Sequence, residues 1–185
     1  MPPPVRRVAF AMTLLFFTGL AAGFLAAGYT HDFLRRLGSP LGAPVEQLLG
    51  NKYLLALLIL ANNMKVLLIL LVSGVTVVGP AVIIFVNGVV VGVVLMLASS
   101  KLPLEALLLS VLPHGIVEIP AFIYAASTST VFGIALWERV LKRKELGGSV
   151  KLLLVGTLVS AALIAVAAVV EAFVTPSLLL DYLQP

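Results

Sequence analysis

Long apolar blocks separated by short polar runs form the main pattern of this chain. Five blocks are long enough to cross a bilayer as a helix, which takes about 20 mostly apolar residues. They cover about residues 8–29, 57–78, 81–98, 115–137 and 152–174. The pattern predicts an all-α fold, a polytopic transmembrane helical bundle in a single integral membrane domain spanning residues 1–185.

Glycine and proline divide the longest apolar stretch, residues 53–99. At about 1.5 Å per residue it is too long for one span, so we expect a hairpin with a helix break at Gly79 and Pro80. Residues 99–113 are too short to cross and predict a re-entrant or interfacial helix before the fourth span. The helix breaks expected at that point are Pro113, Gly115 and Pro120.

The first block follows Arg6 and Arg7 and allows two interpretations. A cleaved signal peptide also combines basic residues with an apolar stretch. Its apolar region is usually only about 7–15 residues long. We therefore favour a retained helix over residues 8–29.

Small residues four apart recur in two predicted spans. They allow membrane helices to approach closely, within one chain or between copies. Glycine is also common in membrane helices generally, so the pattern alone identifies no partner. The predicted helix-packing residues are Gly19, Gly23, Gly88 and Gly92.

Composition supports the membrane assignment, because 61% of the 185 residues are hydrophobic and only 11% are charged. A soluble domain carries about 25% charged residues. The lipid bilayer is thus the expected partner of the apolar surface. The net charge of +4 does not indicate nucleic acid, because basic residues occur in short runs between apolar blocks. The absence of cysteine excludes disulfides and thiolate sites.

Lysine and arginine also indicate an orientation, because cytoplasmic loops carry an excess of both. Arg6, Arg7 and the basic residues of 138–151 fall on one side if five spans alternate. We expect a multi-pass protein of the cell membrane with a cytoplasmic N-terminus and its C-terminus outside. Against this trend, the basic residues then placed outside are Arg35, Arg36 and Lys52.

Strongly polar side chains inside predicted spans are functional candidates, because they are costly in hydrocarbon. One polar group is Asn62, Asn63 and Lys65, and the other is His114 and Glu118. Both groups lie toward the outer side in the predicted topology and are therefore expected to be neighbours. The candidate polar cluster comprises Asn62, Asn63, Lys65, Asn87, His114 and Glu118.

Several pairings within this cluster remain open. Glu118 can accept a hydrogen bond from His114, from an asparagine amide or from Lys65, forming a structural clasp between spans. Asn62 and Asn63 can instead donate to backbone carbonyls freed by the prolines. His114 and Glu118, one helical turn apart, also suit a proton relay or half a metal site. A catalytic metal usually has three protein ligands, so no metal is expected.

No catalytic constellation is recognisable, so we expect no enzymatic activity, no catalytic residue and no cofactor. Ser127 and Ser129, in the run 125–130, have no lysine or histidine partner at a recognisable spacing. The glycines form no phosphate-binding loop. Packing by small hydroxyl residues explains this run better.

Two polar motifs are more specific than the apolar residues around them. The first is the Asn62-Asn63 pair, which is followed by Lys65. The second is the run from Pro113 to Pro120, in which Pro-His-Gly precedes Glu118. In this order the motifs resemble the stage II sporulation protein M family, from about residue 53 through the fourth span and into the fifth.

The resemblance implies a polytopic helical protein with the character of a scaffold. In sporulating bacteria the member that names the family helps to localise cell-wall-degrading partners during engulfment, and many members belong to organisms that do not sporulate. We expect a non-enzymatic scaffold or membrane-organising component with membrane-protein partners or as a homo-oligomer. The alternative is a small transporter, channel or permease subunit. A scaffold requires a dry, paired polar cluster, whereas a permease requires one that water can reach.

Overall fold

The computed structural model describes residues 3–36, 51–99, 102–142 and 145–176. The long helices in these ranges are α1 (Pro3–Arg36), α3 (Lys52–Ser73), α4 (Gly79–Ser99), α5 (Leu104–Lys142) and α6 (Gly148–Phe173), with a short 3-10 helix, η1 (Gly74–Thr76), after α3. Each long helix contains one segment of sufficient length and apolarity to span a membrane. These segments are Pro4–Tyr29, Lys52–Thr76, Gly79–Ser99, Gly115–Leu141 and Gly148–Phe173. The predicted all-α membrane fold with five spans is confirmed.

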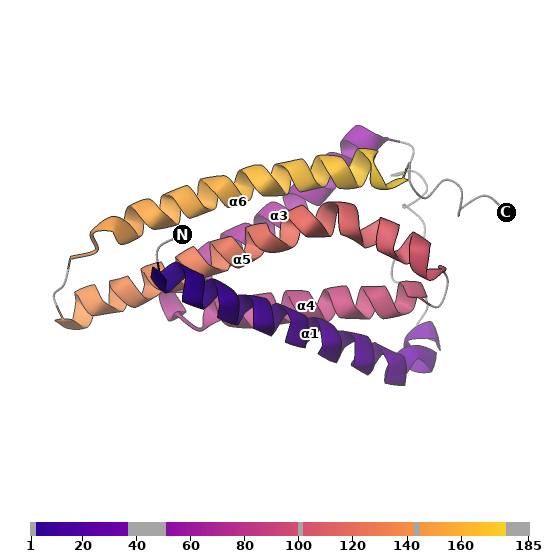
Figure 1. The fold of residues 1–185 in the computed structure, drawn as a ribbon, viewed down its shortest axis with the longest axis horizontal. Coiled ribbons are helices and arrows are strands. Elements are labelled where there is room, and N and C mark those ends of the chain that lie inside the picture. Colours follow the sequence, from indigo (N-terminus) through magenta and orange to yellow (C-terminus); the bar gives the residue numbers. More distant parts are fainter. Residues whose placement is uncertain (1–2, 37–50, 100–101, 143–144, 177–185) are drawn as a thin grey trace.

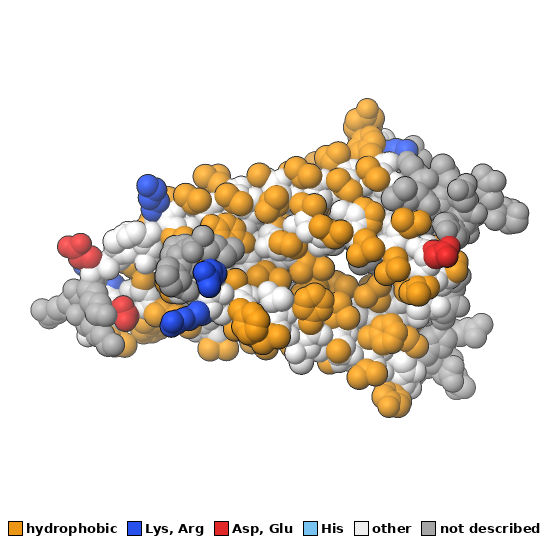
Figure 2. All heavy atoms as spheres, in the orientation of Figure 1, with side chains coloured by type: hydrophobic (Ala, Val, Ile, Leu, Met, Phe, Trp, Pro, Cys, Tyr) orange, Lys and Arg blue, Asp and Glu red, His pale blue; other side chains and the backbone are white. Residues whose placement is uncertain are grey.

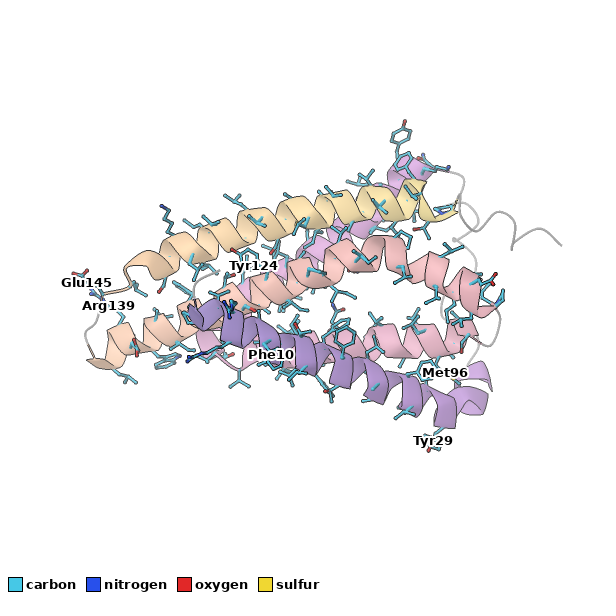
Figure 3. All side chains as sticks on the ribbon, in the orientation of Figure 1. Phe10, Tyr29, Met96, Tyr124, Arg139 and Glu145 are labelled. Carbon is cyan, nitrogen blue, oxygen red and sulfur yellow. The ribbon has the colours of Figure 1, made fainter. Side chains whose placement is uncertain are left out.

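The helices lie lengthwise in one bundle, with α1, α4 and α6 running in one direction and α3 and α5 in the other (Figure 1). Figure 3 shows Tyr29 and Met96 at one end and Arg139 and Glu145 at the other. The start of α1, the turn between α3 and α4 and the connection between α5 and α6 therefore share one end. Charged side chains gather toward the two ends, with hydrophobic side chains between them (Figure 2), as a bilayer-spanning protein requires.

Helix α5 is the core of the bundle and contacts each of the other four long helices. Half of its most apolar 18-residue window is buried, against 17–28% for the other spans. Its span is also the least hydrophobic of the five. The helix with the most polar residues thus lies where neighbouring helices, rather than lipid, surround it. The pair α1–α4 packs on one side of it, and α3 and α6 pack on the other.

The four predicted packing glycines lie in the interface between α1 and α4. Gly19 and Gly23 face the backbone of α4, and Gly88 and Gly92 face the backbone of α1 in return. A side chain at any of these positions would overlap a carbonyl oxygen of the facing helix. The facing residues are, in the same order, Phe85, Val89, Phe16 and Leu20. Close backbone contact of this kind maximises dispersion contacts between membrane helices.

The turn between α3 and α4 lies slightly earlier than predicted. The chain reverses at η1 and Val77, whose φ of 64° is unusual for a β-branched residue. The Gly79 N–H donates to Thr76 Oγ1 at 2.9 Å, which stabilises the turn. Gly79 and Pro80 therefore begin α4 rather than separating two helices. Proline suits a first turn because its missing N–H would have no partner within the helix.

Helix α5 differs more from the prediction, because it continues through Pro113, Gly115 and Pro120. Residues 104–112 are its first turns and not a separate re-entrant or interfacial helix, so the break expected there was wrong. Each proline removes one backbone donor, which bends the helix near its start (Figure 1) without ending it. Within a bilayer a bend is less costly than leaving a whole turn of backbone unpaired.

Candidate functional site

A hydrogen bond joins α3 to α5 inside the membrane-spanning region. Asn63 Nδ2 donates to Glu118 Oε2 at 2.9 Å. The Asn63 side chain is buried and the Glu118 side chain is half-buried. By helical rise Asn63 lies about 16 Å from the start of α3, well within the span. The structure thus brings together one residue from each of the two predicted polar groups, and the asparagine donates to a carboxylate rather than to a freed backbone carbonyl.

A cavity of about 350 Å³ lies beside this hydrogen bond. Three helices contribute its lining, which consists of Leu58, Ile59, Asn62, Asn63, Glu118 and Glu171. Leu58 and Asn62 are exposed, so the cavity opens to the outside of the bundle. Two carboxylates and two carboxamides line it without a basic side chain among these residues. The lining therefore suits a cationic or hydrogen-bond-donating group.

Glu171 was absent from the predicted cluster. It lies near the end of α6, where it follows a long apolar run and reads in the sequence as the start of a polar tail. The antiparallel packing of α6 against α3 brings it to the cavity. Its acidic side chain just inside the last apolar block was the available signal. The sequence does not show which residues lie beside Glu171, because that depends on the pairing of α3 with α6.

Asn62, which lines the cavity, and Lys65, which does not, both have exposed side chains near the middle of α3. Lys65 is about 20 Å from one end of its span and about 17 Å from the other by helical rise. Lysine reaches the membrane surface only from positions near helix ends, and at the centre it costs about 3 kcal/mol on insertion scales. Lys65 makes no hydrogen bond or ion pair with any residue that the structure describes. It is therefore not part of the clasp within this chain.

Of the remaining predicted residues, Asn87 does not line the cavity. Asn87 is half-buried on α4, which packs mainly against α1. His114 lies in α5 one turn before Glu118, but its side chain is outside the described residues, and so is the expected pairing with Glu118. Within the described ranges no group of three or more histidine, aspartate and glutamate side chains is arranged to hold a metal ion.

Small hydroxyl residues of α5 pack tightly about 16 Å farther along the helix. Ser129 Oγ donates to the carbonyl oxygens of Leu70, at 2.8 Å, and Leu71, at 3.1 Å. Closer to Glu118 along α5, Ser160 Oγ of α6 donates to the Ala121 carbonyl oxygen at 2.8 Å. Gly74 of η1 touches Ser129 so closely that no side chain fits there. These contacts close the bundle toward the end that holds the N-terminus.

Comparisons with known proteins agree with this architecture. A model of the family described as stage II sporulation protein M matches residues 12–176, which include most or all of each long helix. An uncharacterized protein of Methanocaldococcus jannaschii is 30% identical over 129 residues, covering 65% of this chain and 70% of that protein. No solved structure matches the chain. The family match begins within α1 and extends past Glu171. The chain therefore belongs to the stage II sporulation protein M family.

Proposed function

We propose that this protein is a non-enzymatic scaffold that organises partner proteins or the bilayer itself. The observation that carries the proposal is the Asn63–Glu118 hydrogen bond at 2.9 Å, because it uses polar groups of the span to hold α3 against α5. The serine bonds of Ser129 and Ser160 hold neighbouring helices in the same way. Polar groups used in this manner give a fixed framework on which other membrane proteins can assemble.

In the part of the chain that the structure describes, the surface available to such partners consists mainly of helix faces. Only residues 77–78 separate η1 from α4, and residues 143–147 separate α5 from α6. Large apolar side chains are exposed on every long helix. The proposed partners are therefore lipid and other membrane proteins, which contact these faces within the bilayer.

The proposed location is the cell membrane, with the N-terminus in the cytoplasm and the C-terminus outside. This orientation is supported by basic residues at the end of the bundle where α1 begins and α5 gives way to α6. They include Arg6, Arg7, Arg139 and Lys151. Cytoplasmic loops carry an excess of lysine and arginine.

A second candidate, a small permease or channel subunit, is favoured by one observation, the cavity of about 350 Å³ lined by Asn62, Glu118 and Glu171. Ionisable side chains facing a water-filled cavity inside a membrane often mark an ion or proton pathway. The closely packed hydroxyl region around Ser129 then corresponds to a closed state. Transport requires that region to open.

Water access to the cavity separates the two candidates. The chain contains no cysteine, so single substitutions give a clean background. Leu58→Cys and Asn62→Cys report on the cavity, and Leu57→Cys is the control, since Leu57 is exposed but does not line it. In oriented vesicles a scaffold keeps both cavity positions protected from a membrane-impermeant thiol reagent. A permease leaves them labelled from one side and Leu57→Cys unlabelled. Glu145→Cys, at an exposed position shortly before α6, reports the orientation.

A flux measurement completes the test. Purified protein is reconstituted into liposomes that contain a pH-sensitive dye and are held under an imposed potassium or proton gradient. A scaffold gives no flux above that of empty vesicles. Flux that is present in the wild type and lost in Glu118→Gln would replace the scaffold proposal with the permease.

A further inference from the structure

Helix α3 carries an exposed seam with the spacing of a coiled coil. The seam residues, spaced alternately four and three apart, are Leu58, Asn62, Lys65, Ile69 and Val72. Its apolar members are exposed by 46%, 55% and 74%, in chain order. Alternating spacings of four and three keep one side of a helix against a partner helix, and pairs of membrane helices use the same geometry.

The centre of this seam is polar where lipid would otherwise cover it. Lipid satisfies leucine, isoleucine and valine, but offers no hydrogen-bond acceptor to the Asn62 amide or the Lys65 ammonium. Both residues are exposed near the middle of the span. Whatever covers the seam must therefore supply acceptors, and preferably negative charge, at that depth.

A second copy of the chain carries such acceptors at the matching depth. Glu118 bonds Asn63 through one oxygen, and a carboxylate accepts several hydrogen bonds. Lys65 lies two residues beyond Asn63, which is about 3 Å of helical rise. Copies inserted in the same orientation share their depth in the membrane. The Lys65 ammonium of one copy is thus level with the cavity of its neighbour.

The direction in which these groups point also fits a second copy. Around α3, Lys65 lies about 20° to one side of Leu58, whereas Ile59 and Asn63 lie about 100° and 140° to the other side. The cavity of each copy is therefore on one flank of the seam and Lys65 is toward the opposite flank. A two-fold axis along the membrane normal places opposite flanks against each other. Lys65 consequently faces the cavity of the partner rather than its own.

We propose that the protein forms a parallel two-fold dimer through the α3 seam, in which Lys65 of each copy enters the cavity lined by Asn62 and Glu118 in the other. Asn62 and Lys65 are then polar residues within a helical seam, a position where such residues set register and the number of strands. The inference extends the proposed scaffold, because a partner lysine in the cavity holds two copies together. Its tests measure cross-linking between copies, whereas the proposed function is tested by water access and flux.

Cysteine cross-linking in native membranes tests the seam. Leu58→Cys and Ile69→Cys are each oxidised with copper phenanthroline, which joins two thiols as a disulfide. Leu57→Cys and Leu68→Cys are the controls, because both residues are 60% exposed at nearly the same depths but lie off the seam. We expect several-fold more disulfide-linked dimer at the seam positions. Equal cross-linking at seam and control positions would overturn the dimer.

A mixed experiment tests the lysine contact. One tagged copy carries Lys65→Cys and a differently tagged copy carries Glu118→Cys, and both are expressed in the same cells. After treatment with a bifunctional thiol reagent, a cross-link between the two tags is expected, since each copy has only one thiol. A direct disulfide is not expected, because a contact between a lysine and a glutamate side chain leaves the Cα atoms more than about 7 Å apart. Disulfides at Leu58→Cys and Ile69→Cys without this mixed cross-link would reject the assignment of Lys65 to the cavity.

The charge itself is tested without altering the cavity. Lys65→Leu makes the seam more apolar, yet we expect it to reduce cross-linking at Ile69→Cys, because the contact with the partner's carboxylate is lost. Lys65→Arg preserves the charge and should retain cross-linking. If Lys65→Leu dimerises as well as the parent, apolar packing alone accounts for the seam and the charge contact is rejected.

Discussion

The two parts of the bundle on either side of α5 are held together by different contacts. Helices α1 and α4 meet through glycines, so that backbone touches backbone. Helices α3 and α6 meet α5 partly through side-chain hydrogen bonds, including those of Asn63 and Ser160. The cavity beside the Asn63–Glu118 bond lies in the second region.

This difference shows where the molecule has the capacity to bind or assemble. A glycine interface leaves no space between the helices, and its strength is dispersion over many atoms. Hydrogen bonds between longer side chains separate the helices and leave acceptors beside the contact. We therefore interpret the α1–α4 pair as rigid support and the α3–α5–α6 region as the part that acts on partners.

The largest expected effect on stability is in the α1–α4 pair. Gly88→Leu introduces a side chain where the Phe16 carbonyl oxygen already lies, and should lower the free energy of unfolding by about 3 kcal/mol. Chemical denaturation in detergent, followed by circular dichroism, measures it. Gly148→Leu is the control, because no atom lies within 4 Å of an added Cβ there. Equal effects at the two glycines would show that the close contact is unimportant.

A smaller effect on stability is expected in the α3–α5–α6 region. Asn63→Leu removes the donor whose hydrogen bond Glu118 accepts and should cost about 2 kcal/mol, because a partly buried acceptor is left without its partner. Asn62→Leu changes an exposed neighbour of the same type and should alter the stability of dispersed monomer by less than about 0.5 kcal/mol. The same denaturation assay compares them. If Asn62→Leu is as damaging as Asn63→Leu, the clasp does not stabilise the fold.

The serine bonds should contribute less. Ser129→Ala removes a hydroxyl that donates to the backbone of α3 and should cost about 0.6 kcal/mol, the average for such bonds between membrane helices. Thr157→Ala is matched to it, because that hydroxyl donates within its own helix to the Leu153 carbonyl oxygen at 2.8 Å. The unfolding midpoint of each variant is compared with that of the wild type, and the two differences are then compared with each other. No difference between the two variants would contradict a contribution from Ser129.

The smallest effect on stability is expected at the edge of the α3–α5–α6 region. Trp137 Nε1 donates to the Val75 carbonyl oxygen at 2.8 Å, beside the turn after α3. Trp137→Phe keeps most of the apolar contact and should cost about 0.5 kcal/mol, because this hydrogen bond is exposed. Unfolding must be followed by circular dichroism and not by tryptophan fluorescence, since Trp137 is the single tryptophan. If Trp137→Phe lowers the free energy of unfolding as much as Asn63→Leu, the main contact of the α3–α5–α6 region is at Trp137 instead.

Several features of the site could be predicted from the sequence. Asn63 and Glu118 stand out because strongly polar residues are rare in apolar blocks, and alternation of the spans places both toward one side. The bond between them still required the structure, since Asn62 and Lys65 were equally good candidates in the sequence. Those two residues point outward because helical rotation turns only one side of α3 toward α5.

Local composition alone specifies the membrane environment, the five spans and the small residues suited to close packing, because each depends on a short window of the chain. Only the packed bundle decides that α5 bends at its prolines and continues, since that outcome balances a lost donor against the backbone bonds that neighbouring helices protect. The same holds for Glu171. Its contact with the cavity depends on the pairing of α6 with α3, which are separated by two other long helices in the sequence and meet only because their surfaces fit.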